Sequence, residues 1–122
     1  MNLKNKTVLI TGGTGSFGQV MVNCLLKQNN IKKIIIYSRD EFKQKLMKDK
    51  INSEKVRYFI GDIRDKTRLA IATMNVDLII HAAALKQVDV AEYNPTEFIQ
   101  TNIIGAQNLI ETCAINNIKK II

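Results

Sequence analysis

A chain of 122 residues with 46% hydrophobic residues and a net charge of +7 is long enough for one domain with its own core. No apolar run approaches the roughly 20 residues that a membrane-spanning helix needs, and residues 1–11 lead into a strand rather than form a signal peptide. The lysines are scattered and aromatic residues are few, so we expect a cytoplasmic protein without nucleic-acid or membrane partners.

Strands and helices alternate along the whole sequence. Apolar runs such as Ile34-Ile35-Ile36 are typical of parallel strands buried on both faces. The sequence predicts strands over Thr7–Thr11, Lys33–Ser38, Val56–Ile60, Val76–His81 and Lys119–Ile122. It predicts helices over Ser16–Asn29, Glu41–Lys50, Lys66–Thr73 and Pro95–Asn116. We therefore expect an α/β fold, a doubly wound, Rossmann-type parallel sheet of strand order 3-2-1-4-5 that is cut short in its fifth strand.

The last predicted helix carries apolar residues at three- and four-residue steps. Its expected buried stripe is Ile99, Ile103, Ala106, Ile110 and Cys113. Gly105 disfavours a helix interior and therefore indicates close packing against a neighbouring element. Cys24 and Cys113 lack metal-ligand spacing, so we expect two buried free thiols and no metal site.

The first strand is followed by a glycine-rich turn, Thr11-Gly12-Gly13-Thr14-Gly15-Ser16-Phe17-Gly18, and then by a helix. This order is typical of a dinucleotide-binding site. Gly12 allows the sharp reversal after the strand, Gly15 lets a pyrophosphate approach the backbone, and Gly18 lets the helix pack close to the sheet. We expect the turn and the helix start to bind a dinucleotide; the alternative is an ordinary flexible turn.

The end of the second strand, Tyr37-Ser38-Arg39-Asp40, should meet the adenosine ribose of that dinucleotide. Arg39 can pair with a 2′-phosphate through its forked guanidinium, Ser38 can add a hydrogen bond, and Lys43 lies one turn further on. The sequence therefore favours NADP over NAD as the cofactor. Asp40 is either a helix cap or a ligand of an unmodified ribose.

Two further strand ends contribute candidate residues. Asp62 and Ile63 would contact the amino group and the ring of adenine, unless Asp62 caps a turn. The small residues Ala82-Ala83-Ala84 would let their loop pass close beneath a cofactor, or would pack tightly against the core. We interpret His81 as a sheet-end histidine with satisfied hydrogen bonds. Lys86 either lies near the nicotinamide ribose or is an exposed loop residue.

Six segments resemble the extended short-chain dehydrogenase/reductase superfamily: TGGTGSFG, YSRDEFKQ, GDIRD, HAAALKQV, AEYNP and TNIIGAQN. The combination of SRDE, AAALKQV and EYNP is more specific than the glycine turn, and is similar to the soluble UDP-N-acetylglucosamine 4,6-dehydratases, including the inverting type. The resemblance covers essentially the whole chain. It implies a tightly bound NADP, a UDP-sugar substrate and a homo-oligomer. Such enzymes take a hydride from sugar C4, eliminate water across C5–C6 and return the hydride to C6; the inverting branch also inverts C5.

The resemblance also implies a role for each matching residue. The pyrophosphate would be held by Thr11, Gly12, Thr14, Gly15, Ser16, Phe17 and Gly18. The adenosine phosphate end would contact Ser38, Arg39 and Lys43, and adenine would lie between Asp62 and Ile63. The nicotinamide side would be lined by Ala82, Ala83, Ala84 and Lys86. Asn102 would support the active-site loops.

The superfamily's catalytic Tyr-x-x-x-Lys motif is absent, because Tyr37, Tyr58 and Tyr93 are each followed four residues later by an acidic residue. We therefore interpret residues 1–122 as the N-terminal part of a dinucleotide-binding domain, without the sugar-binding domain, and expect no turnover from them alone. The alternatives are a UDP-sugar 4-epimerase of the same superfamily and a stand-alone, non-catalytic dinucleotide-binding module. A stand-alone module would be a stable monomer, whereas a partial domain would associate through its apolar edge, Ile118, Ile121 and Ile122.

Overall fold

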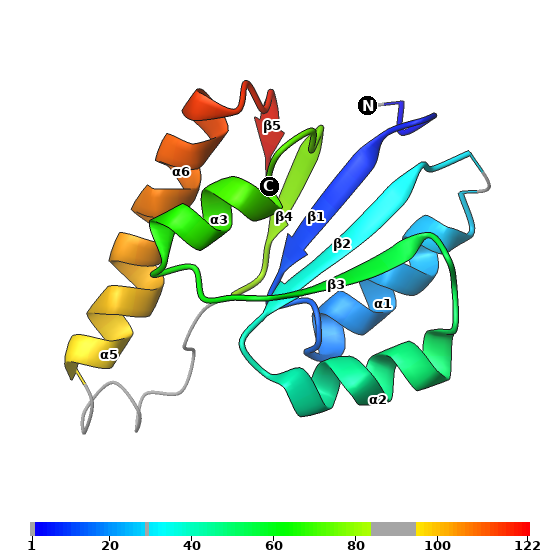
Figure 1. The fold of residues 1–122 in the computed structure, drawn as a ribbon, viewed down its shortest axis with the longest axis horizontal. Coiled ribbons are helices and arrows are strands. Elements are labelled where there is room, and N and C mark those ends of the chain that lie inside the picture. Colours follow the sequence, from blue (N-terminus) through cyan, green and yellow to red (C-terminus); the bar gives the residue numbers. More distant parts are fainter. Residues whose placement is uncertain (1, 29, 84–94) are drawn as a thin grey trace.

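The computed structural model describes residues 2–28, 30–83 and 95–122. These residues form a five-stranded parallel sheet of order β3-β2-β1-β4-β5, with helices on both faces (Figure 1). The strands are β1 (Thr7–Thr11), β2 (Lys33–Ser38), β3 (Val56–Ile60), β4 (Leu78–His81) and β5 (Lys120–Ile121). The predicted doubly wound fold and its strand order are confirmed.

Helices α1 (Ser16–Leu26) and α2 (Glu41–Ile51) cover one face of the sheet, and α3 (Lys66–Ala72) and α6 (Gly105–Ile115) cover the other (Figure 1). A π-helical turn, η1 (Gln100–Ile104), joins α5 (Pro95–Ile99) to α6. The element boundaries differ little from those predicted: α1 ends at Leu26, short of Asn29, and β4 begins at Leu78 rather than Val76.

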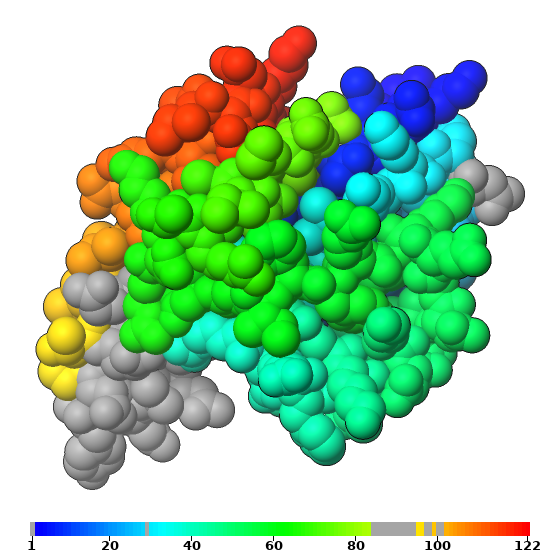
Figure 2. All heavy atoms as spheres, in the orientation of Figure 1, coloured from blue at the N-terminus to red at the C-terminus, as the bar shows by residue number. Residues whose placement is uncertain are grey.

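Alternate side chains of the central strand enter two different cores, because successive residues of a strand point to opposite faces. Val8 and Ile10 of β1 are fully buried on the side of α1, where they join Val22. Leu9 is fully buried on the opposite side, where it joins Leu109 of α6. Figure 2 shows the green atoms of the β3 and α3 region covering most of the blue strand β1. This packing holds the carboxyl ends of the strands together at one end of the sheet.

The predicted buried stripe of the last helix is correct at Cys113 but wrong at its three isoleucines. Ile99, Ile103 and Ile110 are 46%, 60% and 62% exposed. The buried residues of α6 are Gly105, Leu109, Thr112 and Cys113, and only the last of these belongs to the predicted stripe. Isoleucines lie on several sides of this helix, and the side with a glycine can approach its neighbours most closely: a Cβ on Gly105 would lie 2.5 Å from Ile63 Cδ1. The predicted close packing at Gly105 is therefore confirmed, although the face of the helix was misassigned.

The two cysteines differ in exposure. Cys113 is buried as predicted, and burial raises the pKa of its thiol, but Cys24 is exposed on α1, which corrects the prediction of two buried thiols. Within the described ranges, no three His, Cys, Asp or Glu residues cluster as metal ligands would. In the same part of the chain, no helix combines the length and apolarity needed to cross a membrane.

β5 is the outermost described strand beside β4, and its edge carries exposed apolar side chains. Ile121 and Ile122 are exposed, whereas Ile118 is buried. Such edges pair with other chains. We expect the 122-residue chain to self-associate in sedimentation velocity experiments, and Ile122→Lys to shift most of it to monomer. A wild-type chain that stays monomeric at every concentration would contradict this expectation and favour a stand-alone module.

Candidate dinucleotide-binding site

A cavity of about 370 Å³ lies at the carboxyl ends of the central strands. These ends are neighbours because Thr11 of β1 pairs with Tyr37 of β2 on one side and with His81 of β4 on the other. The predicted site residues that line the cavity are Gly12, Thr14, Gly15, Ser38, Arg39, Lys43, Asp62, Ile63, Ala82 and Ala83. The fold thus gathers residues from four separate segments around one cavity, where the rule for doubly wound sheets places a ligand.

The glycine turn has the backbone geometry that its sequence predicts. Gly12 has a φ of +64°, and a Cβ there would lie 2.8 Å from Ala83 Cα. A Cβ on Gly18 would overlap the backbone of Gly13. The closest approach at Gly18 is therefore to the backbone of the turn itself; its role in packing the helix against the sheet stays a prediction. At Gly15 the nearest atom to an added Cβ is Gly12 O at 3.6 Å, so that side of the turn is open.

The start of α1 offers backbone donors to the cavity. Its N-cap is Gly15, no side chain caps it, and its first turn contains no acidic residue. The first N–H groups of a helix have no partner within the helix, and they carry the positive end of its dipole. Ser16 and Phe17 begin this turn with exposed side chains. The arrangement suits a bound pyrophosphate.

The end of β2 is fixed by a buried glutamine. Gln44 Nε2 of α2 donates to Ser38 Oγ at 2.8 Å, to Ser38 O at 3.3 Å and to Phe59 O at 3.1 Å. Asp40 is the N-cap of α2, where its carboxylate accepts from the Lys43 N–H at 3.0 Å. Of the two roles considered for Asp40, the structure shows the helix cap. These contacts set the direction in which Ser38 and the following Arg39 leave the sheet.

The end of β3 places Asp62 within an ion-pair network. Arg64 donates to Asp62 Oδ2 through Nε at 2.9 Å and Nη2 at 2.5 Å, and its backbone N–H donates to Oδ1 at 2.9 Å. Arg39 Nη1 lies 3.7 Å from the same Oδ2. Burial by itself raises the pKa of the Asp62 carboxyl, but the hydrogen bonds and charge of Arg64, with the charge of Arg39, bring it below its usual value.

Two side chains that the sequence analysis did not single out hold this turn through hydrogen bonds. The Tyr37 hydroxyl donates to Asp62 O at 2.8 Å, and burial raises the pKa of Tyr37 far above its usual value. Asn108 Nδ2 of α6 donates to Ile63 O and to Arg64 O, both at 3.1 Å. Tyr37, Asn108 and Gln44 could have been found by one feature of the sequence. Each is a polar residue among neighbours that pack against the sheet.

Thr11 and His81 form a hydrogen-bonded pair beneath the turn. Thr11 Oγ1 accepts from the N–H groups of Ala82 at 3.1 Å and Ala83 at 3.3 Å, and lies 2.7 Å from His81 Nδ1. Because two donors already point at the threonine oxygen, its own proton is directed to Nδ1, which must be unprotonated. Burial lowers the pKa of His81 accordingly. His81 ends β4 with its Nδ1 paired to Thr11, as the interpretation of a sheet-end histidine expects.

The stability of the chain should fall as the pH drops below about 6.5, the usual histidine value. The pKa of His81 is lowered in the folded state, so below the usual histidine pKa the unfolded chain binds more protons than the folded chain. Stability that is present above the usual pKa is therefore lost as the pH falls toward the lowered pKa of the folded state. Urea unfolding at about pH 7.5 and pH 5.5 measures the effect. His81→Asn keeps an acceptor for Thr11 without titrating, and should flatten the dependence. An equal slope in both proteins would contradict this assignment.

The other predicted residues of the glycine turn, Thr11, Ser16, Phe17 and Gly18, are not among the lining residues of the cavity, and neither is Asn102. Asn102 lies half-buried in η1, and π-helical turns often occur at functional sites. Ala84 and Lys86 fall in residues 84–94, outside the described part of the chain. Their predicted positions on the nicotinamide side therefore stay predictions.

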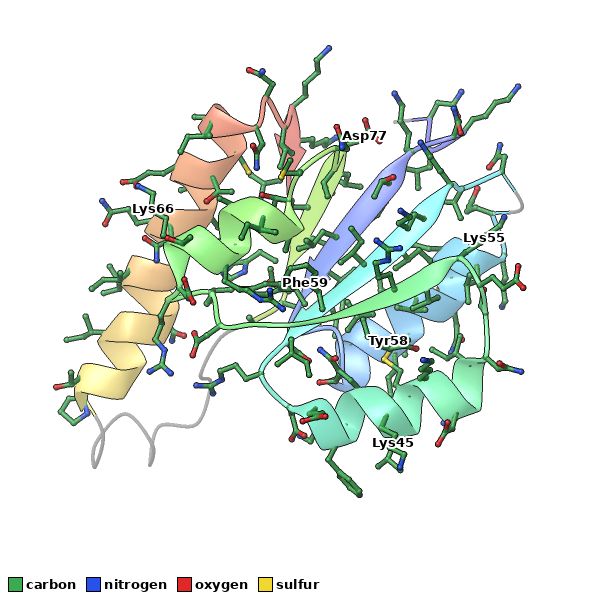
Figure 3. The ribbon with its side chains drawn as sticks, viewed as in Figure 1. Lys45, Lys55, Tyr58, Phe59, Lys66 and Asp77 are labelled. Carbon is green, nitrogen blue, oxygen red and sulfur yellow. The ribbon has the colours of Figure 1, made fainter. Side chains whose placement is uncertain are left out.

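A larger groove of about 970 Å³ runs along the outer side of α2. Its walls include Phe42, Lys45, Lys48 and Tyr58, and Figure 3 shows Tyr58 between β3 and α2. This groove has no glycine turn in its lining, and the helix N-terminus that it contains, that of α2, is capped by the Asp40 carboxylate and carries Glu41 in its first turn, so it suits a pyrophosphate poorly. The smaller cavity is the better candidate for a dinucleotide, despite its size.

Comparison with known proteins agrees with this fold. Residues 8–122 match the family described as polysaccharide biosynthesis protein. An inverting UDP-N-acetylglucosamine 4,6-dehydratase of Campylobacter jejuni is 59% identical over 117 residues, which cover 96% of this chain and 35% of the relative. A UDP-glucose 4-epimerase of Rickettsia bellii is 46% identical over 121 residues, covering 97% of this chain and 36% of the relative.

A solved structure shares the fold as well. A dTDP-glucose 4,6-dehydratase from Streptomyces venezuelae, with NAD and TYD bound, has a TM-score of 0.84 at 26% identity, over 94% of this chain and 38% of that one. The chain spans about a third of the length of the curated relatives it matches. The resemblance read from the six sequence segments is confirmed. The chain belongs to the polysaccharide biosynthesis protein family.

Proposed function

We propose that the chain binds NADP and forms the cofactor-binding part of a UDP-N-acetylglucosamine 4,6-dehydratase. The observation that carries the proposal is one cavity that joins an uncapped helix start to two cationic side chains, Arg39 and Lys43. The 59% identity to a dehydratase of that substrate supports the choice of enzyme class. The homo-oligomeric state and the cytoplasmic location expected from the sequence remain part of the proposal. The exposed side chains of Ile103 and Ile110 offer an apolar surface for contact between subunits.

The residues of the cavity suit the pyrophosphate, the 2′-phosphate and the adenine of NADP. The open side of the turn at Gly15 and the N–H groups of α1 suit the pyrophosphate. Arg39 and Lys43 supply positive charge for a 2′-phosphate, which a plain ribose would not need. Ile63 provides an apolar surface for adenine. Bound NADP would supply reversible hydride transfer at the sugar, while the described residues bind and orient it. Without Tyr-x-x-x-Lys, we expect residues 1–122 alone to form no product.

Arg39→Ala should weaken NADP binding by about 10- to 100-fold, because a charge-assisted hydrogen bond to a phosphate contributes roughly 1.5–3 kcal/mol. NAD binding should change much less, since NAD carries no 2′-phosphate. Isothermal titration of both dinucleotides measures the two dissociation constants. Lys45→Ala is the matched control, because it removes an exposed positive charge from α2 outside the cavity. Tighter binding of NAD than of NADP by the wild type would refute the proposed cofactor.

A UDP-sugar 4-epimerase is the second candidate, and the 46% identity to the Rickettsia epimerase favours it. Both enzymes would use the same cofactor cavity, so binding experiments do not separate them. Mass spectrometry of the products of an enzyme that carries this chain does: a dehydratase gives a UDP-sugar lighter by one water, and an epimerase gives one of unchanged mass.

A further inference from the structure

The carboxylate of Asp62 lies between two arginines that stand in different places. Asp62 and Arg39 line the cavity, whereas Arg64, which also contacts Asp62, is not among the lining residues. Both guanidinium groups address the same atom, Oδ2, but at different distances: 2.9 Å and 2.5 Å for Arg64 Nε and Nη2, and 3.7 Å for Arg39 Nη1. Arg64 therefore makes the hydrogen bonds to Oδ2, and Arg39 makes the longer ion pair.

Arg64 is held in this place by its backbone. Its N–H donates to Asp62 Oδ1, and its carbonyl accepts from Asn108 Nδ2 of α6. The Asp62 carbonyl in turn accepts from the Tyr37 hydroxyl. The side chain of Arg64 is about one-third exposed, with 30% of its surface accessible, compared with 50% for Arg39. Arg64 is thus the more enclosed of the two arginines, on a turn anchored from both sides.

We propose that Arg64 is a positioning residue for cofactor selectivity: it holds the Asp62 carboxylate and thereby keeps Arg39 directed to the 2′-phosphate of NADP. This inference rests on the proposed function. A forked guanidinium satisfies the carboxylate through two hydrogen bonds to Oδ2, which a point charge cannot do equally well.

Without the Arg64 guanidinium, the Asp62 carboxylate would compete more strongly with the 2′-phosphate for Arg39. Asp62 would keep a partly buried carboxylate without its two hydrogen bonds, which is unfavourable. Arg39 starts 3.7 Å from Oδ2 and needs only a small movement to replace them. Paired with Asp62, Arg39 no longer serves a phosphate, so NADP loses affinity and NAD, which lacks that phosphate, does not.

The test measures the ratio of the NAD and NADP dissociation constants of the 122-residue chain by isothermal titration. Arg64→Gln should lower the preference for NADP by about tenfold, the value of one charge-assisted hydrogen bond. Arg57→Gln removes an exposed arginine from the same strand region and should leave the ratio unchanged. The double variant Asp62→Asn with Arg64→Gln also removes the carboxylate that competes with the 2′-phosphate for Arg39. It should restore the preference for NADP over NAD to within about threefold of the wild type.

The possible outcomes separate this inference from the proposed function. If the wild type binds NADP more tightly than NAD and Arg64→Gln leaves the ratio within about twofold, the inference is wrong and the proposed function stands. A double variant that fails to recover the preference also overturns the inference. A wild type that binds neither dinucleotide overturns both. Should Arg64→Gln not fold by circular dichroism, Arg64→Lys keeps the charge without the fork and should lower the ratio by about threefold; an unchanged ratio would contradict the inference.

Discussion

Gly15→Asp should reduce dinucleotide binding at least about 100-fold while leaving the chain as stable as the wild type or slightly more stable. Gly15 is the N-cap of α1, with extended backbone angles of φ −74° and ψ 178°, and no side chain caps this helix. An aspartate there can accept hydrogen bonds from the first turn, which contributes a few tenths of a kcal/mol relative to glycine. The same carboxylate places a negative charge where the pyrophosphate is expected, so binding and stability change in opposite directions.

Titration with NADP and urea unfolding, done on the same samples, measure both effects. Gly15→Ser is the matched control, because serine caps a helix without a charge; it should bind NADP within about tenfold of the wild type. Undiminished binding by the Gly15→Asp chain would place the pyrophosphate somewhere else. A large loss of stability would mean that the open space beside Gly15 is needed by the fold itself.

Gly18→Ala should destabilise the chain by about 1–3 kcal/mol, although alanine favours helices by about 1 kcal/mol over glycine. A methyl group at this position would overlap the backbone of Gly13, which is not the movable end of a side chain. The helix and the turn would have to separate, and the phosphate-facing backbone would move with them. NADP binding should therefore weaken together with stability.

Gly15→Ala controls for the chemical change from glycine to alanine within the same turn. A Cβ there meets no atom closer than 3.6 Å, so its unfolding free energy should stay within about 0.5 kcal/mol of the wild type. Urea unfolding curves of the three proteins decide the question. A Gly18→Ala chain as stable as Gly15→Ala would show that helix and turn are not packed as described.

The fold could be predicted from sequence because its signals are local and agree with one another. Three consecutive isoleucines, Ile34-Ile35-Ile36, mark a strand buried on both faces, and the rules for parallel sheets then fix the strand order. The glycine turn was recognisable because Gly12 needs a positive φ that few other residues adopt. The ends of the strands then had to meet at one end of the sheet, so most of the cavity lining followed from topology alone.

The rest depends on contacts between distant segments, which local patterns do not contain. Ile103 and Ile110 read as core residues, yet the helix turns Leu109 and Gly105 inward, because packing against Ile63 selects among several apolar faces. The turn after β3 is held by Asn108, which lies more than 40 residues further along the chain, and Arg39 of the β2 end contacts Asp62 of that turn. Side-chain partners of this kind are set by tertiary structure.

A crystal structure of the chain grown with NADP tests the central claim most directly. The account predicts the pyrophosphate against the backbone of the turn from Gly12 to Gly18, and the 2′-phosphate beside Arg39. It would be contradicted by a turn whose space is filled by protein side chains, with the dinucleotide bound at another place or absent from crystals grown with saturating NADP.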